Sequence, residues 1–243
     1  SVLNVIKMKN ATVQYKDSTI HYYDLLESGY NPDSHITKGI IYAREDHQFG
    51  SLLQHIPQGG VVYDIGAYIG TFSIPMAIEG FNVHAFEGFP FNAKRAAKNC
   101  EAYSSIRVHD VAVSNKSYSV TTKFNDCTDQ GEREEAPIQY VELDEYMKEH
   151  SLPNPDFVKV DIEGMETVAL FGMKNLIKNV KPVWQLCYHA GHPEKHDHYP
   201  GFVKTEDGGF DFKTLFEDYH ISVGGYPVTE FNQWGEYLMV PKR

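Results

Sequence analysis

The chain has 243 residues, of which 42% are hydrophobic, so it can build a full core and is not a globally disordered protein. Its 22 Lys and Arg against 33 Asp and Glu give a net charge of −11, which repels phosphate backbones and disfavours a polynucleotide substrate. No apolar run in the sequence approaches the roughly 20 residues of a membrane span, and no signal peptide is visible.

Three cysteines, Cys100, Cys127 and Cys187, show no metal-binding spacing, and their odd number favours free thiols in a reducing compartment, hence a cytoplasmic protein. The length fits one sizeable α/β domain with a small addition. Because the sequence begins at Ser1 rather than Met, it is consistent with one domain of a longer multidomain protein.

The first expected elements precede the main domain. Residues 11–23 alternate between apolar and polar side chains, which predicts a β-hairpin. Residues 28–39 are typical of a loop, and residues 42–56 of a helix with one apolar face. We therefore expect residues 1–44 to be a hairpin-and-loop addition to a domain that spans residues 45–243.

A glycine-containing turn follows the first core strand. Residues 61–65 predict a buried strand, and a helix is expected to start near residue 71. A strand that turns through glycines into a helix presents backbone N–H groups to a cofactor. Dinucleotide enzymes usually have G-x-G-x-x-G, whereas this chain has D-x-G-x-x-x-G, with Asp64 at the first position. A carboxylate there repels a pyrophosphate and attracts the ammonium and sulfonium of S-adenosylmethionine (SAM). The candidate SAM-binding residues of this turn are Asp64, Gly66, Ala67, Tyr68 and Gly70.

The second strand is expected at residues 82–87 and ends in Glu87, 21 residues after Gly66. A carboxylate at this place can accept both ribose hydroxyls of an adenosine ligand, although a helix-capping or solvated acid is the alternative. Gly88 and Phe89 follow, and the Phe89 ring either packs against the adenine or belongs to the core.

The third strand is expected at residues 106–113. Asp110 lies where it could bind the amino group of an adenine, with a polar strand-end residue as the alternative. Gly88, Val111 and Asp161 complete the candidate cofactor-binding set. The later elements are expected as possible strand 118–124, strand 138–141, helix 143–152, helix 168–180 interrupted near Gly172, strand 182–189, helix 210–219 and strands 219–223 and 236–240.

A second stretch with chemical potential surrounds the strand at residues 157–160. Asp161 stands at the carboxyl end of this strand, the end that faces the ligand in an open α/β sheet. Asp161, Glu163 and Glu166 place three carboxylates within six residues, although acids are also common at the first turn of a helix. Lys159 lies inside an apolar strand, where a lysine needs a partner or a function.

The strand at residues 182–189 ends in His189, and His192, His196 and His198 follow it. Four histidines so close together can form a metal cluster or belong to a loop over the substrate. No zinc-like ligand pattern accompanies them, so we favour the loop.

Several runs together resemble the FkbM family of SAM-dependent methyltransferases: residues 62–70, residues 85–87 with Pro90 and Asn92, Leu143-Asp144, and residues 157–166. The resemblance covers about residues 45–240. It implies a Rossmann-like class I methyltransferase fold, with a seven-stranded, mostly parallel sheet, helices on both faces and the last strand antiparallel. It also implies methyl transfer to a hydroxyl, often of a sugar or a polyketide.

The chain departs from the family pattern at two places. The family commonly has a proline where this chain has Gly88. It also commonly has an acid near the end of the fifth strand, where this chain has Leu186-Cys187-Tyr188-His189.

The expected function is SAM-dependent O-methylation of a sugar, a glycan or a similar hydroxylated small molecule. A hydroxyl becomes a good nucleophile when a base accepts its proton, and we expect His189 in this role because imidazole titrates near neutrality. Asp161 would orient the hydroxyl or the histidine, and Lys159 and Glu163 would support them. In a variant, Asp161 and Glu163 hold Mg²⁺ or Mn²⁺, since hard cations prefer carboxylates.

Two other functions compete with this one. A nucleotide-dependent oxidoreductase could use a similar sheet, although Asp64 in place of the first glycine argues against it. A non-catalytic domain could keep the fold for protein or glycan binding.

Overall fold

The computed structural model describes residues 8–26, 52–122, 135–189, 212–223, 226–227 and 235–242. The predicted loop at 28–39, the first part of the helix predicted at 42–56, Cys127, and His192, His196 and His198 lie outside these ranges. Cys100 and Cys187 are free thiols. Within the described part of the chain, no helix is both long enough and apolar enough to cross a membrane.

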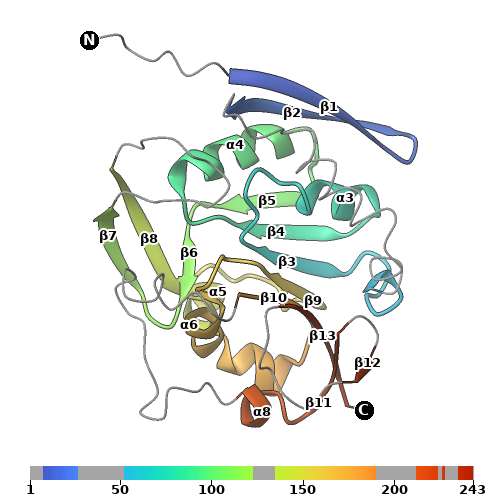
Figure 1. Ribbon diagram of the computed structural model, residues 1–243, viewed down its shortest axis with the longest axis vertical. Helices are drawn as coiled ribbons and strands as arrows, with labels where there is room; N and C mark the ends of the chain where they lie inside the picture. The colour runs from blue at the N-terminus through green and yellow to red at the C-terminus, as the bar shows by residue number, and fades with distance from the viewer. Residues whose placement is uncertain are drawn as a thin grey trace.

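The centre of the molecule is an eight-stranded sheet (Figure 1). Its strands, in spatial order, are β5 (Ile106–His109), β4 (Asn82–Phe86), β3 (Val61–Ile65), β9 (Phe157–Val160), β10 (Val183–Tyr188), β13 (Gly235–Pro241), β11 (Tyr219–Val223) and β12 (Tyr226–Pro227). Strands β5, β4, β3, β9 and β10 run parallel to one another. Strand β13 is antiparallel to both of its neighbours, β10 and β11. The predicted mostly parallel sheet with an antiparallel last strand is therefore confirmed, with the two-residue β12 as an addition at the edge.

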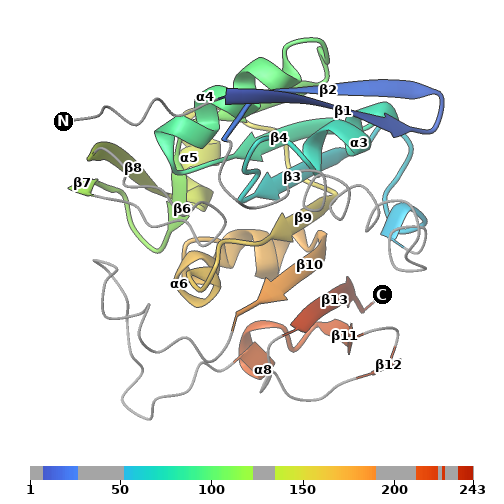
Figure 2. The same cartoon turned by 45° about the horizontal axis from the view of Figure 1, so that its top comes forward.

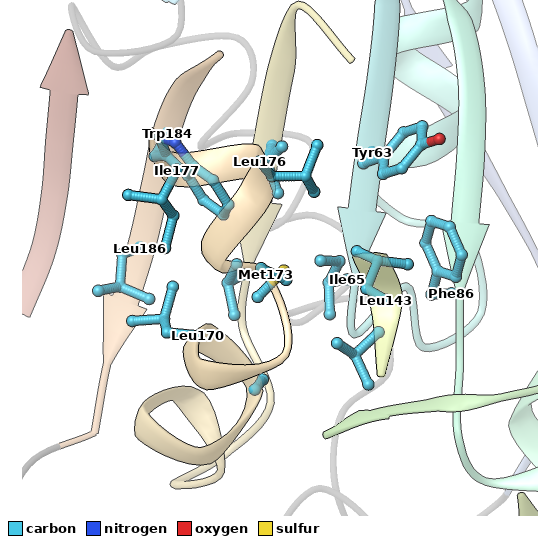
Figure 3. Packing of buried hydrophobic residues seen from close by; sticks show 14 of the residues in the cluster. Tyr63, Ile65, Phe86, Leu143, Leu170, Met173, Leu176, Ile177, Trp184 and Leu186 are labelled. Atoms are coloured by element: carbon cyan, nitrogen blue, oxygen red, sulfur yellow. The ribbon is translucent and has the colours of Figure 1, made fainter. Parts of the chain in front are cut away.

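Alternation along the strands divides the core into two clusters on opposite faces of the sheet. Tyr63 and Ile65 of β3 belong to one cluster, and Val62 between them belongs to the other. Figure 3 shows the first cluster, in which Leu170, Met173 and other side chains pack on the sheet. The elements that cover this face are α5 (Leu143–Glu149), α6 (Glu166–Phe171), the π-helical turn η1 (Leu176–Val180) and α8 (Phe212–Leu215).

The second face is covered by α3 (Ser73–Ile78), α4 (Pro90–Cys100) and an N-terminal hairpin. The hairpin pairs β1 (Met8–Tyr15) with β2 (Ser18–Leu26) in antiparallel register, which confirms the predicted hairpin. Figures 1 and 2 both show it lying over α4.

The predicted third strand is broken in the structure. Strand β5 ends at His109, and β6 (Ala112–Ser114) belongs to a separate three-stranded sheet with β8 (Ala136–Glu142) and β7 (Tyr118–Thr122). The prediction of one strand over 106–113 was wrong because β6 pairs with β8 and not with β4, so the chain changes sheets at Asp110. Aspartate is a poor strand residue, which suits this break.

The helix predicted at 168–180 forms two shorter pieces, α6 and η1, separated around Gly172, which confirms the predicted interruption. A Cβ at Gly172 would lie 1.9 Å from the backbone oxygen of Ser114. The glycine therefore allows the chain to approach β6 closely at this interruption.

Two buried histidines, His84 on β4 and His109 on β5, face each other with Nδ1 and Nε2 3.0 Å apart. Nδ1 of His109 also lies 3.2 Å from the hydroxyl of Tyr146. Burial and the charge of Arg107 lower the pKa of His84 to about 4. Burial, with His84, Arg107 and His150, lowers the pKa of His109 to about 4 as well.

We expect this pair to make the free energy of unfolding depend on pH. Both folded pKa values lie below the ordinary 6.5, so the unfolded chain binds more protons between pH 6.5 and 4. The contribution is fully present above pH 6.5 and is lost as the pH falls toward 4, by about 3 kcal/mol for one such group. Urea titrations at several pH values measure this loss. A His84→Gln/His109→Gln variant should show a smaller loss, whereas His220→Gln, at an exposed position of β11, should behave as the parent does.

Candidate active site

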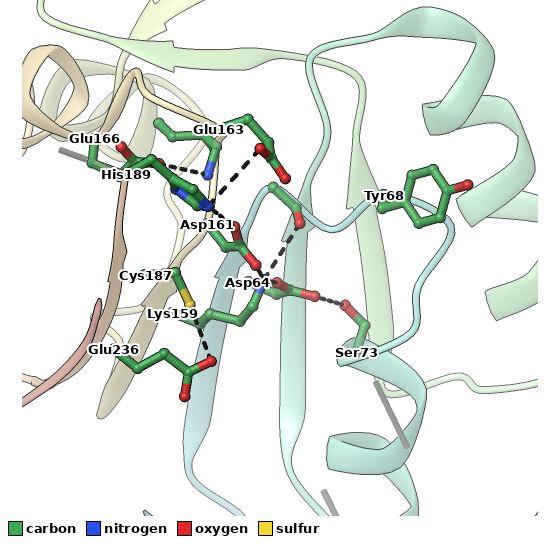
Figure 4. A network of polar contacts seen from close by, with 12 residues as sticks. Asp64, Tyr68, Ser73, Lys159, Asp161, Glu163, Glu166, Cys187, His189 and Glu236 are labelled. Atoms are coloured by element: carbon green, nitrogen blue, oxygen red, sulfur yellow. Dashed lines mark hydrogen bonds and ion pairs between the residues drawn. The ribbon is translucent and has the colours of Figure 1, made fainter. Parts of the chain in front are cut away.

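The candidate functional side chains gather at one edge of the central sheet. Strands β3, β4, β9 and β10 are parallel, so their carboxyl ends meet there. Asp64, Glu87, Asp161 and His189 lie at or just after these ends. Figure 4 shows the network that Asp64 and Asp161 form with Lys159, Glu163, Glu166 and His189.

The turn after β3, residues 66–70, is called the glycine loop below. Gly66, Tyr68 and Gly70 all have a positive φ, of 86°, 54° and 91°. A Cβ at Gly66 would lie 1.8 Å from the backbone oxygen of Asp161, so only glycine fits there. The glycine loop and the catalytic candidate Asp161 are therefore in direct backbone contact.

Glu87 holds the glycine loop to the turn after β4. Its carboxylate accepts the backbone N–H of Tyr68 at 2.8 Å and that of Phe89 at 2.9 Å. A carboxylate oxygen has two lone pairs, so an oxygen that accepts a backbone N–H can also accept a ribose hydroxyl of an adenosine ligand. Glu87 thus fits the ribose of SAM. Gly88 is needed because a Cβ there would lie 2.5 Å from the Cβ of Ala112.

Asp64, which is predicted to face SAM, is buried and bound by two other side chains. Its side chain is 0% exposed, and its oxygens accept the Ser73 hydroxyl at 2.6 Å and the Lys159 ammonium at 3.1 Å. Asp64 and Lys159 are direct partners across β3 and β9. In this structure, an ammonium of SAM would have to compete with Lys159 for the Asp64 carboxylate.

Lys159 connects Asp64 to the second chemical stretch. Its Nζ lies 3.4 Å from the backbone oxygen of Gly66 and 3.8 Å from the carboxylate of Asp161. Burial alone would lower the pKa of Lys159, but the negative charges of Asp64 and Asp161 outweigh burial and raise it. Lys159 is therefore a cation that ties the glycine loop to Asp161.

His189 is oriented by Glu166, a residue that the sequence patterns did not single out as functional. The Nδ1 of His189 lies 2.9 Å from Oε1 of Glu166, whose side chain is 1% exposed. A carboxylate only accepts hydrogen bonds, so Nδ1 carries the hydrogen and the lone pair of the neutral ring is on Nε2. Glu166 also accepts the backbone N–H groups of Ile162 and Gly164.

The Nε2 atom of His189 points toward two further carboxylates. It lies 4.0 Å from Asp161 Oδ1 and 3.9 Å from Glu163 Oε2. Burial would lower the pKa of His189, but the hydrogen bond to Glu166 and the charges of the three carboxylates together raise it. The imidazole is thus held as a basic group at the edge of the sheet.

One ligand atom each from Asp161, Glu163 and His189 lies within 4.8 Å of the other two. Two carboxylates and an imidazole suit a divalent cation, and a histidine whose second nitrogen donates to a carboxylate is common at metal centres. This group of side chains can therefore either hold a cation or move a proton.

The structure brings Lys159, Asp161, Glu163 and His189 together, as the sequence predicts. Phe89 and Val111 are 4% and 7% exposed, and Asp110 is exposed in the break between β5 and β6. Ser73 and Glu166 were missed. A signal for Glu166 existed in the spacing of Asp161, Glu163 and Glu166, but such acids are common at helix starts.

Comparison with known proteins gives a family for this arrangement. The model of the methyltransferase FkbM domain matches residues 64–212. A hexuronic acid methyltransferase, AglP, of Haloferax volcanii is 27% identical over 135 residues, which is 53% of this chain and 56% of AglP. The crystal structure of methyltransferase FkbM from Methylobacillus flagellatus superposes with a TM-score of 0.50 at 20% identity, covering 79% of this chain and 46% of that one. The chain thus spans about half the length of these relatives, and the likeness supports the predicted class I methyltransferase fold.

Proposed function

Because the chain belongs to the FkbM family of methyltransferases, we propose that it methylates a hydroxyl of a sugar, a glycan or a similar small molecule with SAM as methyl donor. The observation that carries this proposal is the orientation of His189 by buried Glu166, which directs a basic nitrogen toward the carboxyl ends of β9 and β10. Methyl transfer to a hydroxyl requires a positioned base because a neutral hydroxyl is a poor nucleophile. Amines and thiols are more nucleophilic and depend less on such a base.

In this proposal, one group of residues binds SAM and a neighbouring group binds and deprotonates the acceptor. Bound SAM supplies a methyl group on a positively charged sulfur, which is an electrophile. Glu87 binds the ribose hydroxyls, and the glycine loop shapes the adjacent backbone. Asp64 keeps Lys159 in place through their ion pair. We propose that Asp64 affects SAM binding indirectly, because Lys159 in turn contacts the backbone oxygen of Gly66 in the glycine loop.

With SAM bound, His189 would accept the proton of the acceptor hydroxyl at Nε2 while the hydroxyl oxygen bonds to the methyl carbon, the bond from that carbon to sulfur breaks, and S-adenosylhomocysteine leaves. Asp161, 4.0 Å from this nitrogen, orients the hydroxyl or stabilises the imidazolium, and Glu163, 3.9 Å from the same nitrogen, supports it. Lys159 holds Asp161 through the 3.8 Å ion pair. Placing base and nucleophile together removes much of the entropic cost of the reaction.

The acceptor class is supported by the name of the relative in Haloferax volcanii, a hexuronic acid methyltransferase. The net charge of −11 disfavours a polynucleotide as the acceptor. The free thiols of Cys100 and Cys187 suit a reducing, cytoplasmic setting.

Mass spectrometry of candidate glycans and small hydroxylated metabolites incubated with the protein and SAM tests the proposal. We expect a mass gain of one methylene equivalent, and mild base should leave an ether intact while it hydrolyses a methyl ester. Calorimetric titration with SAM and with NAD runs in parallel. Binding of NAD instead of SAM would indicate an oxidoreductase, and binding of neither would favour a non-catalytic domain.

The Glu87→Ala variant should bind SAM more weakly by about 1–3 kcal/mol, the range for losing a hydrogen bond to a charged group. The reason is that Glu87 both faces the ribose position and fixes Tyr68 and Phe89. Glu101→Ala, an exposed acid after the end of α4, is the matched control and should keep the parent affinity. Equal calorimetric affinities for the two variants would contradict the role of Glu87.

A cation variant of the proposal places Mg²⁺ or Mn²⁺ on Asp161 and Glu163 and predicts that EDTA abolishes turnover and that either ion restores it. Direct Mn²⁺ binding, followed by its paramagnetic resonance signal, should then weaken in Glu163→Gln. Full turnover after exhaustive chelation would exclude the cation variant, and the mechanism with His189 as the base and no cation would remain.

A further inference from the structure

The N-terminal hairpin shares a core with the elements that carry the cofactor candidates. Ile20 and Tyr22 of β2 are fully buried, in the same cluster as Ile69 of the glycine loop and Ile74 of α3. Figures 1 and 2 show the hairpin over α4, at the side of the sheet where α3 and α4 lie. The hairpin lies outside residues 64–212, the part that matches the family model.

One buried side chain, Asn99 of α4, links the hairpin directly to the glycine loop. Its Oδ1 accepts the backbone N–H of Tyr23 at 2.8 Å, and its Nδ2 donates to the backbone oxygen of Ile69 at 2.9 Å. Asn99 is 3% exposed, and its bond to the glycine loop is buried while its bond to the hairpin is partly buried. A movement of β2 away from α4 would therefore remove a partner from the asparagine that holds the loop.

The far end of the hairpin is attached to α3, the helix that follows the glycine loop. The Tyr15 hydroxyl donates to Glu79 at 2.6 Å, and Lys16 donates to the same carboxylate at 2.7 Å. Glu79 is the residue at the carboxyl end of α3. The hairpin is thus linked to the glycine loop through Asn99 and to the carboxyl end of α3, the helix that follows the loop.

The glycine loop needs such external support. Three of its five residues have a positive φ, and one of them is Tyr68, for which this conformation is unfavourable. Residues of this kind keep their conformation only where the surrounding structure determines it. Glu87 fixes the loop from β4, and Asn99 fixes it from α4 and the hairpin.

We propose that the hairpin 8–26, acting through Asn99, is a clamp that preorganises the glycine loop and so sets the affinity for SAM. This inference rests on the proposed function, because it requires the glycine loop to bind SAM. Asn99 and the hairpin are positioning elements, and neither touches the reacting atoms. Thermodynamic coupling is reciprocal, so SAM must in turn strengthen the attachment of the hairpin.

Hydrogen exchange of the unmodified protein, with and without S-adenosylhomocysteine, tests this reciprocity. We expect S-adenosylhomocysteine, the product that SAM leaves after methyl transfer, to slow exchange at the Tyr23 amide, which donates to Asn99, and also at the amides of the glycine loop. Protection of the loop with unchanged exchange at Tyr23 would overturn the clamp, although SAM binding and the proposed function would stand. No binding of the product or of SAM to the unmodified protein would overturn both.

An Asn99→Leu variant gives the second measurement, because leucine keeps the approximate size and removes both hydrogen bonds. We expect its calorimetric affinity for S-adenosylhomocysteine to fall by about 5- to 100-fold, a usual range for coupling between two sites. Tyr63→Phe is the matched control, since it removes another buried side-chain bond to a backbone oxygen, that of Pro153, away from the loop. Both variants should lose stability, but only Asn99→Leu should lose affinity; equal affinities in the two would contradict the clamp.

Discussion

Replacing His189 by alanine is expected to lower kcat by roughly 10²–10⁴-fold while the affinity for SAM stays nearly unchanged. The reason is that Nε2 is the only nitrogen of the ring that can take a proton, since Nδ1 donates to Glu166. Glu87 and the glycine loop, which we propose bind SAM, follow β4 and β3, and this substitution leaves their hydrogen bond intact.

The alanine variant also removes a partner from Glu166, which is 1% exposed, so some loss of stability is expected as well. A His189→Gln variant separates the two effects. Glutamine can donate to Glu166 and fill the space, but it cannot accept a proton, so it should be stable and as inactive as the alanine variant. Turnover at saturating SAM and the melting temperature must be measured on the same preparations. Turnover within a few-fold of the parent in either variant would remove His189 as the base and make Asp161 the leading candidate.

The features that could be predicted from sequence are those set by local patterns. Short runs of apolar residues located β3, β4, β9 and β10, and the parallel arrangement of these strands then brings Asp161 and His189 to one edge. The glycine loop was predictable because a positive φ at Gly66 and Gly70 demands glycine. Residues that follow buried strands can therefore be placed together without knowing any side-chain contact.

The features that could not be predicted depend on contacts between distant segments. Asp64 lies at a strand end, as expected, but its orientation follows from its register partner Lys159, 95 positions later in the chain. Glu166 is indistinguishable in sequence from an ordinary acid at a helix start, and its role appears only when β10 delivers His189 beside it. The break after His109 likewise depends on the pairing of β6 with β8.

The buried pair Asp64–Lys159 gives the largest expected effect on stability. Lys159→Met should lower the free energy of unfolding by about 3–5 kcal/mol, the usual consequence of leaving one charge of a buried pair without its partner. Asp64 would then keep the neutral hydroxyl of Ser73, at 2.6 Å, in a place with no exposure to water. Asp64→Asn should cost less, because Lys159 retains the carboxylate of Asp161 at 3.8 Å and the backbone oxygen of Gly66.

The double variant Asp64→Asn/Lys159→Met tests whether the pair itself causes these losses. Removing both charges abolishes the uncompensated carboxylate, so the double variant should be more stable than Lys159→Met alone, and the two substitutions should be strongly non-additive. Denaturant titrations of the four proteins provide the comparison. Additive losses would mean that the ion pair contributes little and that packing around Lys159, including the Phe72 ring 5.5 Å from its Nζ, accounts for the effect. Affinity for SAM should fall in the two variants that lack Lys159, because Lys159 is the contact that joins Asp64 to the backbone of the glycine loop.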